Sequence, residues 1–285
     1  MKIARYWQRS DIEMTGRDGY PYTVTGWGWS NSDEQEAKQR AVDSAQAIVA
    51  RLTAGQGFPD GYEYLDRPRR EEIVKEVRGD DGELIAAVTR NHYGSLVLNT
   101  ASMMFIDIDL PVESGFASFV RSVKQMFGLA AQSPADRKRA EIRAAAARFP
   151  GATFRVYRTL AGFRIAVMHK RISPGSAESA EMFAAFGSDP LYVRLCARQE
   201  SFRARLTPKY WRCGGPRPSF SFPYETPQAR DAHESWKRAY DAACSTFASC
   251  TFVEQIGTRP ALADHVRLSR LHDTAARAES QLPLA

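Results

Sequence analysis

Short runs with several apolar residues, bounded by polar and turn residues, recur along the chain and predict strands joined by tight turns. Residues 71–77 and 83–90 are two such runs, and they are separated by RGDDG, whose glycine and aspartate residues favour a hairpin turn. Two more short strands are expected at 95–100 and 103–109, and an aromatic-rich strand is expected at 20–29.

A second hairpin is expected further along the chain. The segments TFRVYR, residues 153–158, and FRIAVMH, residues 163–169, flank the turn TLAG. A last strand, TFVEQIG, is expected at 251–257. Strands that follow one another through short turns pair antiparallel, so the sequence predicts a mainly antiparallel sheet.

Apolar residues at helical spacing predict helices between these strands. Ser32 and Gln35 form a capping-box start for one helix, and Ser133-Pro134 opens an alanine-rich one. Residues 116–127 also show helical spacing. We therefore expect an α+β protein with helices on the faces of its sheet.

The pattern changes to mostly helix after residue 174. Asp189-Pro190 and Thr226-Pro227 are both good helix starts, and a last helix is expected at 260–278. We expect a single α+β domain over residues 1–285 with a helical C-terminal portion. If the chain divides, the sheet-rich core should span 1–172 and the helical, basic portion 173–285.

Composition narrows the class of protein. The chain has 285 residues, of which 44% are hydrophobic and 25% charged, as in ordinary folded proteins. It has no apolar run long enough to span a membrane, and its N-terminus lacks the apolar core of a signal peptide. The four cysteines form no CxxC pair, which favours free thiols. We therefore expect a cytoplasmic protein without membrane contact.

Positive charge is concentrated in one segment. Between Arg194 and Arg217, seven arginine and lysine residues face a single acid, Glu200, whereas the whole chain carries a net charge of +6. The segment also interleaves cations with aromatic residues, a composition that suits nucleic acid because cations neutralise phosphates and rings stack on unpaired bases. The candidate nucleic-acid-binding residues are Arg203, Arg205, Lys209, Trp211 and Arg212. Alternatively, the aromatic residues pack into the core and the arginines pair with acids on neighbouring helices.

Two aspartates end the expected strand MMFIDID. Side chains alternate along a strand, so Asp107 and Asp109 should share one face, with Ile106 and Ile108 on the other. Two neighbouring carboxylates repel each other unless something neutralises them. A divalent metal, Mg²⁺ or Mn²⁺, is one answer, since both prefer oxygen ligands. Arginine pairing and a solvated strand end are the alternatives.

The hairpin over residues 153–169 is a second candidate site. A turn of small residues beside an arginine can hold a phosphate through backbone N–H groups and a guanidinium. An ordinary hairpin with charged rims is equally consistent with the pattern. His169 at its end suits a ligand or base, or simply a polar surface. Further on, His272 and Asp273 are adjacent on the last helix and are not expected to share a face.

The chain lacks the short motifs of several enzyme classes. HExxH, GxSxG and the Walker-type glycine loop do not occur. The sequence therefore gives no support to a zinc protease, an α/β-hydrolase or a P-loop NTPase.

FIDIDLP resembles the first catalytic motif of the archaeo-eukaryotic primase superfamily, an apolar strand that ends in Asp-x-Asp. RTLAGFR resembles the second motif in its Thr159 and Gly162, although Arg164 or Ile165 stands where the family carries a histidine. Glu254 is the best counterpart of the third acid. The likeness covers three short patches. RPRREEIV, FRARLTPKYWR and the terminal LPLA resemble a set of uncharacterised bacterial proteins more closely, and that likeness implies no activity.

The primase resemblance implies an RRM-like sheet and a primase-polymerase activity. Two Mg²⁺ or Mn²⁺ ions on Asp107, Asp109 and the third acid would clamp a triphosphate, with Arg158, Arg164 and His169 on the phosphates. The partner would be a nucleotide, a single strand or a primer-template. Two alternatives remain: a non-catalytic nucleic-acid-binding protein with a degenerate core, and a small-molecule enzyme that uses the same dyad on phosphorylated ligands.

Overall fold

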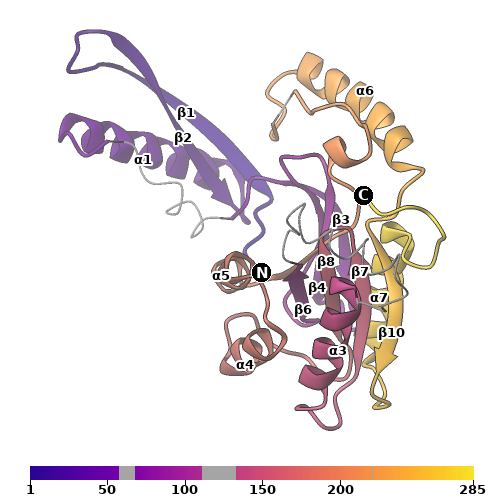
Figure 1. The fold of residues 1–285 in the computed structure, drawn as a ribbon. Coiled ribbons are helices and arrows are strands. Elements are labelled where there is room, and N and C mark those ends of the chain that lie inside the picture. The colour runs from indigo at the N-terminus through magenta and orange to yellow at the C-terminus, as the bar shows by residue number, and fades with distance from the viewer. Residues whose placement is uncertain (58–67, 111–132, 220) are drawn as a thin grey trace.

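A computed structural model describes residues 1–57, 68–110, 133–219 and 221–285 of the chain (Figure 1). Its strands are β1 (Tyr6–Thr15), β2 (Pro21–Ser30), β3 (Glu72–Arg78), β4 (Leu84–Arg90), β5 (Leu96–Thr100), β6 (Phe105–Asp109), β7 (Phe154–Thr159), β8 (Gly162–Val167), β9 (Phe202–Arg205) and β10 (Cys250–Ile256). Its helices are α1 (Glu34–Thr53), α3 (Pro134–Ala146), α4 (Ala177–Phe186), α5 (Pro190–Gln199), α6 (Pro227–Cys244), α7 (Ala263–Ala276) and the short 3₁₀ helix η2 (Tyr210–Arg212).

The expected α+β class is confirmed. The strands form a β1–β2 ribbon and two four-stranded sheets, and every pair of strands in them is antiparallel. Both expected hairpins are present, as β3–β4 and β7–β8. The helix expected at 116–127 lies outside the described residues.

The two larger sheets combine strands from both halves of the chain. The first sheet has the order β3-β4-β5-β9, and the second has the order β10-β7-β8-β6. In the second sheet β8 lies between β6 and β7, whose connection includes α3, as in a split β-α-β unit. Strands β9 and β10 come from the C-terminal part of the sequence, so each sheet is completed by a late strand.

Helix caps explain where several helices begin. Ser133, Asp189 and Thr226 each accept a hydrogen bond from a backbone N–H in the first turn, and Pro follows each of them. These three starts agree with the sequence prediction. The first helix differs, because its N-cap is Asp33 and not Ser32.

The β1–β2 ribbon and α1 form a unit that projects from the two larger sheets (Figure 1). The helix lies very close to β2, where a Cβ atom on Gly28 would sit 2.0 Å from the carbonyl oxygen of Ala37. Glycine on the strand and alanine on the helix permit this approach. Strand β1 was not expected from the sequence, since charged and apolar residues are mixed along it.

Helices cover both faces of the second sheet. On one face α7 packs against it, with the ring centroids of Phe105 and His272 5.4 Å apart. On the opposite face, α4 brings Phe186 to 5.3 Å from Phe154, and α3 lies along the same side. The two sheets adjoin through Tyr192, whose hydroxyl lies 3.1 Å from the Phe105 carbonyl oxygen on β6 and 2.9 Å from that of Arg203 on β9.

Two further expectations can be compared with the structure. All four cysteines are free thiols, as expected. Within the described residues, no helix is both long enough and apolar enough to cross a membrane.

Candidate functional site

The aspartate dyad lies at the edge of the second sheet, where β6 faces β9 of the first. In β6, Ile106 and Ile108 are buried, while Asp107 is partly exposed and Asp109 is exposed. Asp107 pairs in register with Arg164 of β8, and Asp109 pairs with Gly162. A Cβ atom on Gly162 would lie 1.8 Å from the Ile108 carbonyl oxygen, so only glycine permits this pairing.

Arg164 connects the dyad to the interior. Its side chain is 5% exposed, and its Nε lies 3.8 Å from Asp107 Oδ1. Its Nη1 donates to the Arg205 carbonyl oxygen at 2.8 Å and lies 3.3 Å from His272 Nε2. The chain of contacts continues through Asp273 to Arg155, whose Nη2 donates to Asp273 Oδ2 at 2.7 Å. Arg164 is therefore fixed in place by partners on β9 and α7.

Three carboxylates lie close together at the dyad, those of Asp107, Asp109 and Asp189. Burial, the charge of Asp107 and the charge of Asp189 together raise the pKa of Asp109. Asp189 lies close because its backbone N–H donates to the Asp107 carbonyl oxygen at 3.1 Å. The nearby cations Lys209 and Arg205 act in the opposite direction, but they do not cancel the effect. An additional cation would therefore be stabilised here.

Basic residues from β9 and the segment after it face the same dyad. Burial and the neighbouring Arg164 lower the pKa of Arg205 to about 10. Burial, together with Arg205 and Arg212, lowers the pKa of Lys209. The Nε atoms of Arg164 and Arg205 are both buried and have no hydrogen-bond partner in the described part of the protein. Buried donors of this kind favour an anionic ligand, because leaving them unpaired costs free energy.

An aromatic group lies beside these cations. Trp211 is 49% exposed, and its ring contacts Tyr93 edge-on at 5.1 Å. The Lys209 ammonium lies 5.1 Å from the Trp211 ring and 5.6 Å from the Tyr93 ring. An exposed ring held next to a cation is a surface on which a base can stack.

The dyad fits a hard divalent cation with few protein ligands. Mg²⁺ commonly binds through one or two carboxylates and completes its coordination with water and substrate phosphates. Asp107 and Asp109 can supply those carboxylates, and the raised pKa of Asp109 marks a site short of positive charge. Among the residues with described positions, no group of three or more His, Cys, Asp or Glu side chains is placed to hold a metal. The dyad therefore fits a metal shared with a phosphate ligand better than a closed protein cage.

Glu254 does not join the dyad as the third acid. It lies on β10, at the opposite edge of the sheet, and neighbouring strands are about 4.8 Å apart. Its carboxylate is bound by Arg139 and Arg143 of α3, on the face of the sheet away from α7. A β-bulge between Phe252 and Glu254 shifts the register at this point. The expectation that Glu254 acts with the dyad is not supported, because its position is that of a structural ion pair.

The residues expected to hold phosphates are scattered. Arg158 donates to the carbonyl oxygens of Thr159 and Gly162, and Thr159 Oγ1 accepts from the Gly162 N–H at 3.0 Å, so these residues hold the β7–β8 turn together. His169 lies five residues beyond Arg164, about 16 Å at the usual rise of a strand, and is buried. Of the expected phosphate-binding residues, only Arg164 and the turn glycine lie next to the dyad.

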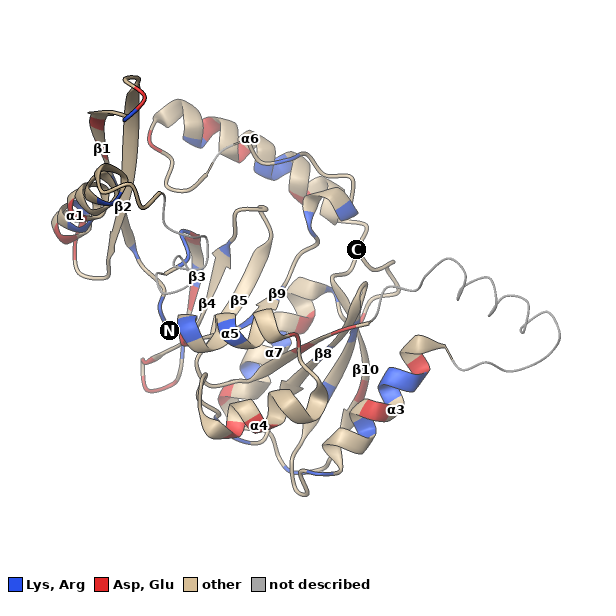
Figure 2. Ribbon diagram, turned by 60° about the vertical axis from the view of Figure 1, so that its left-hand side comes forward, with Lys and Arg blue, Asp and Glu red and all other residues tan. Residues whose placement is uncertain are grey.

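The basic segment has two different roles. Arg203 is nearly buried and donates to both carboxylate oxygens of Glu71, at 2.7 and 2.9 Å. It is therefore paired with an acid, although this acid precedes β3 and does not lie on a helix as the alternative expected. Arg205 and Lys209 instead lie near the dyad, and Arg212 lies near these two cations. Figure 2 shows that basic residues also recur on α3 and α6, next to acidic ones.

Two features of the site were missed or misjudged from the sequence. His272 and Asp273 do interact, since His272 Nδ1 lies 2.9 Å from Asp273 Oδ1, although adjacent helix positions do not normally face each other. Asp189 was recognised only as a helix cap, and its closeness to Asp109 depends on how α5 packs against β6.

We compared the chain with known protein families, curated proteins and solved structures. The chain matches no protein-family model, no curated protein and no solved structure.

Proposed function

We propose that the protein is a metal-dependent nucleotidyl- or phosphoryl-transfer enzyme that acts on nucleotides or nucleic acid. The observation that carries this proposal is the meeting of Asp107 and Asp109 with Arg164 and Arg205. The buried Nε atoms of both arginines make no hydrogen bond in the described chain, and Arg164 Nε lies 3.8 Å from Asp107 Oδ1. Carboxylates that bind a metal and cations that bind phosphate are the recurring parts of phosphoryl-transfer sites.

Each residue has a distinct role in this proposal. Asp107 and Asp109 would hold Mg²⁺ or Mn²⁺, which supplies charge neutralisation at the reacting phosphate and lowers the pKa of a bound hydroxyl. Arg164 and Arg205 would bind phosphate oxygens. Arginine does not exchange a proton near neutral pH, so both would act through charge and positioning only. His272 contacts Arg164 from α7, and Lys209 adds positive charge near the dyad.

A non-catalytic role in nucleic-acid binding is the second candidate. The observation in its favour is the exposed Trp211 ring beside Tyr93 and Lys209, which suits single-stranded nucleic acid without any metal. Retained strand binding without metal binding would favour this candidate over the first.

The experiment is a calorimetric titration with Mn²⁺. We expect the wild type to bind Mn²⁺, and Asp107→Asn or Asp109→Asn to abolish the binding. Glu254→Gln is the matched control, because it also removes a carboxylate but lies on the other face of the sheet, and it should bind like the wild type. Equal binding by all four proteins, or none by the wild type, would contradict the metal site.

A further inference from the structure

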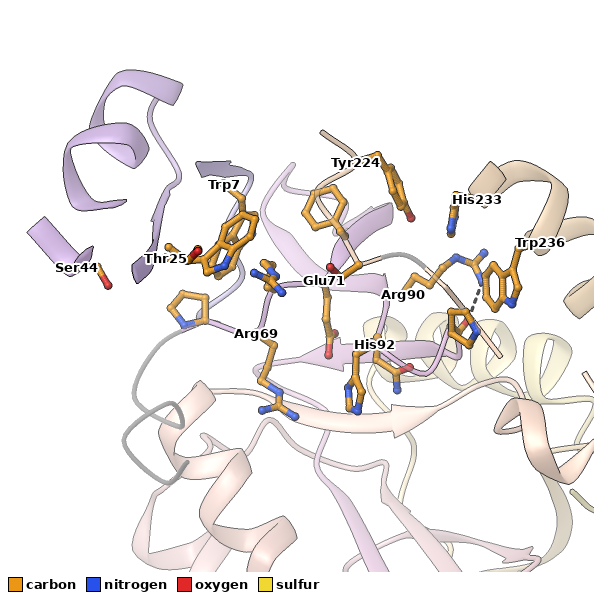
Figure 3. A pocket seen from close by; sticks show the side chains of 18 of the residues that line it. Trp7, Thr25, Ser44, Arg69, Glu71, Arg90, His92, Tyr224, His233 and Trp236 are labelled. Carbon is orange, nitrogen blue, oxygen red and sulfur yellow. Dashed lines mark hydrogen bonds between the residues drawn. The ribbon is translucent and has the colours of Figure 1, made fainter. Parts of the chain in front are cut away.

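A pocket lies away from the dyad, between the β1–β2 ribbon, the β4–β5 turn and α6 (Figure 3). Its volume is about 430 Å³, within the range of sites that hold small molecules. Residues from four distant parts of the sequence line it, so the pocket exists only in the folded chain. Neither the dyad nor any residue expected from the sequence to bind phosphate belongs to its lining.

Flat aromatic rings form opposite walls of the pocket. Trp7 and Trp27 line it from the ribbon, and Tyr224, His233 and Trp236 line it from the side of α6 (Figure 3). On the α6 side the rings of Tyr224 and His233 are stacked with their centroids 4.3 Å apart, and the rings of His233 and Trp236 are tilted with their centroids 5.3 Å apart. Preformed aromatic walls suit a planar ligand, since stacking on a base is worth about 1–3 kcal/mol.

The lining carries more positive than negative charge. Arg69, Arg70 and Arg90 line the pocket against a single acid, Glu71, which is already bound by Arg203. The Arg70 guanidinium lies 3.9 Å from the Trp27 ring centroid, so a cation and an aromatic face are presented together. This charge balance favours an anion.

Two buried donors in the lining lack a partner. Trp7 is 8% exposed and Arg90 is 5% exposed, and neither Trp7 Nε1 nor Arg90 Nε meets an acceptor in the described residues. Both atoms can only donate hydrogen bonds. A ligand that brought acceptor oxygens or ring nitrogens would satisfy them and recover the free energy that unpaired donors cost.

We propose that this pocket binds a nucleotide, with its base between the aromatic walls and its phosphate on the arginines. The same chemistry is offered by a free mononucleotide and by one nucleotide of a single strand. This inference goes beyond the proposed function, because it rests on the residues of the pocket alone. It adds a second place where nucleic acid or a nucleotide contacts the protein.

The test is calorimetry without added metal, using AMP, UMP and a short single-stranded oligonucleotide. We expect a nucleotide to bind, and Arg70→Gln to weaken binding at least tenfold. Arg40→Gln is the matched control: Arg40 also lies over a tryptophan, 4.6 Å from the Trp29 ring, but does not line the pocket. Arg69→Gln provides a second variant if Arg70→Gln does not fold. Binding of the mononucleotides alone or of the oligonucleotide alone identifies the source of the ligand.

Unchanged nucleotide binding in Arg70→Gln, or an equal loss of binding in the control Arg40→Gln, would place the ligand outside this pocket and overturn the inference. Adenosine and inorganic phosphate should each bind much more weakly than AMP. Equal binding of either one, or no binding of any nucleotide at millimolar concentration, would also overturn it.

Discussion

At the scale of single residues, the charged form of Asp109 is disfavoured by its surroundings in the fold. Asp109 lies beside Asp107 and Asp189, and its pKa is raised in the fold by burial and by these two charges. The folded protein therefore binds the Asp109 proton more tightly than the unfolded chain does. The linkage contribution favours folding below the ordinary aspartate pKa of 3.8 and is lost as the pH rises through the folded-state pKa.

We therefore expect Asp109→Asn to stabilise the protein at pH 7. The gain should be about 0.5 kcal/mol, because the side chain is largely solvated and water screens the repulsion. The gain should shrink as the pH falls toward the folded-state pKa of Asp109, because the wild-type side chain then becomes protonated. Urea unfolding of both proteins at pH 7 and pH 4.5 measures the difference.

The exposed residue Glu181 of α4 provides the control for this prediction. Glu181→Gln removes a carboxylate away from the dyad and should leave the free energy of unfolding unchanged within error. A loss of stability in Asp109→Asn at pH 7 would show that Asp109 makes a favourable contact, contrary to the charge balance described above.

At the scale of elements, local patterns predicted more than contacts between distant segments did. The hairpins β3–β4 and β7–β8 could be predicted because turn residues and strand alternation are local signals. Strand β9 was missed because its four residues, FRAR, alternate but are too few to stand out within a basic segment. The position of Glu254 could not be predicted either, because the bulge and the strand order that set it arise only from pairing between β10 and β7.

The candidate site also combines residues that local sequence identifies with residues whose roles depend on distant contacts. The aspartate pair and Arg164 were selected from local sequence, whereas the roles of Arg205 and Arg203 depend on partners 41 and 132 residues away. Both arginines look alike in the sequence. Only the packing of β9 between the dyad and Glu71 separates a site residue from a structural one.

The pairing of β6 with β8 gives a prediction at this scale. Gly162→Ala would place a Cβ atom 1.8 Å from the Ile108 carbonyl oxygen, so β8 must move away from β6. We expect a loss of about 1–3 kcal/mol in the free energy of unfolding, as for other overpacked positions. Because Asp109 pairs with Gly162, Mn²⁺ binding should weaken as well. Urea unfolding and calorimetry measure the two effects.

The neighbouring turn residue supplies the control for the strand pairing. Ala161 is exposed, so Ala161→Ser should change neither stability nor Mn²⁺ binding measurably. Wild-type stability in Gly162→Ala would mean that the two strands tolerate a wider separation than the structure shows.

At the scale of the whole molecule, buried histidines are spread through the fold. His169, His233, His265 and His272 are all buried, and burial is the main cause that lowers the pKa of each. Their contacts agree with the neutral form. His169 Nδ1 accepts from the Thr153 N–H at 3.2 Å, and His272 Nε2 faces a donor on Arg164 at 3.3 Å. Protonating either nitrogen would break its hydrogen bond.

The last prediction concerns the stability of the whole molecule as the pH falls. Because the folded-state pKa values of these histidines lie below the ordinary value of 6.5, the unfolded chain takes up protons first, and stability should fall as the pH drops below that value. Each histidine contributes at most about 1.4 kcal/mol per pH unit. Urea unfolding between pH 7.5 and 5.5 measures how steeply the free energy of unfolding falls with pH. In His272→Gln this pH dependence should be smaller by up to the contribution of one proton. Leu268→Ala, a buried change on the same helix, should lower stability equally at every pH. A pH-independent free energy of unfolding in the wild type would mean that the histidines titrate alike in both states.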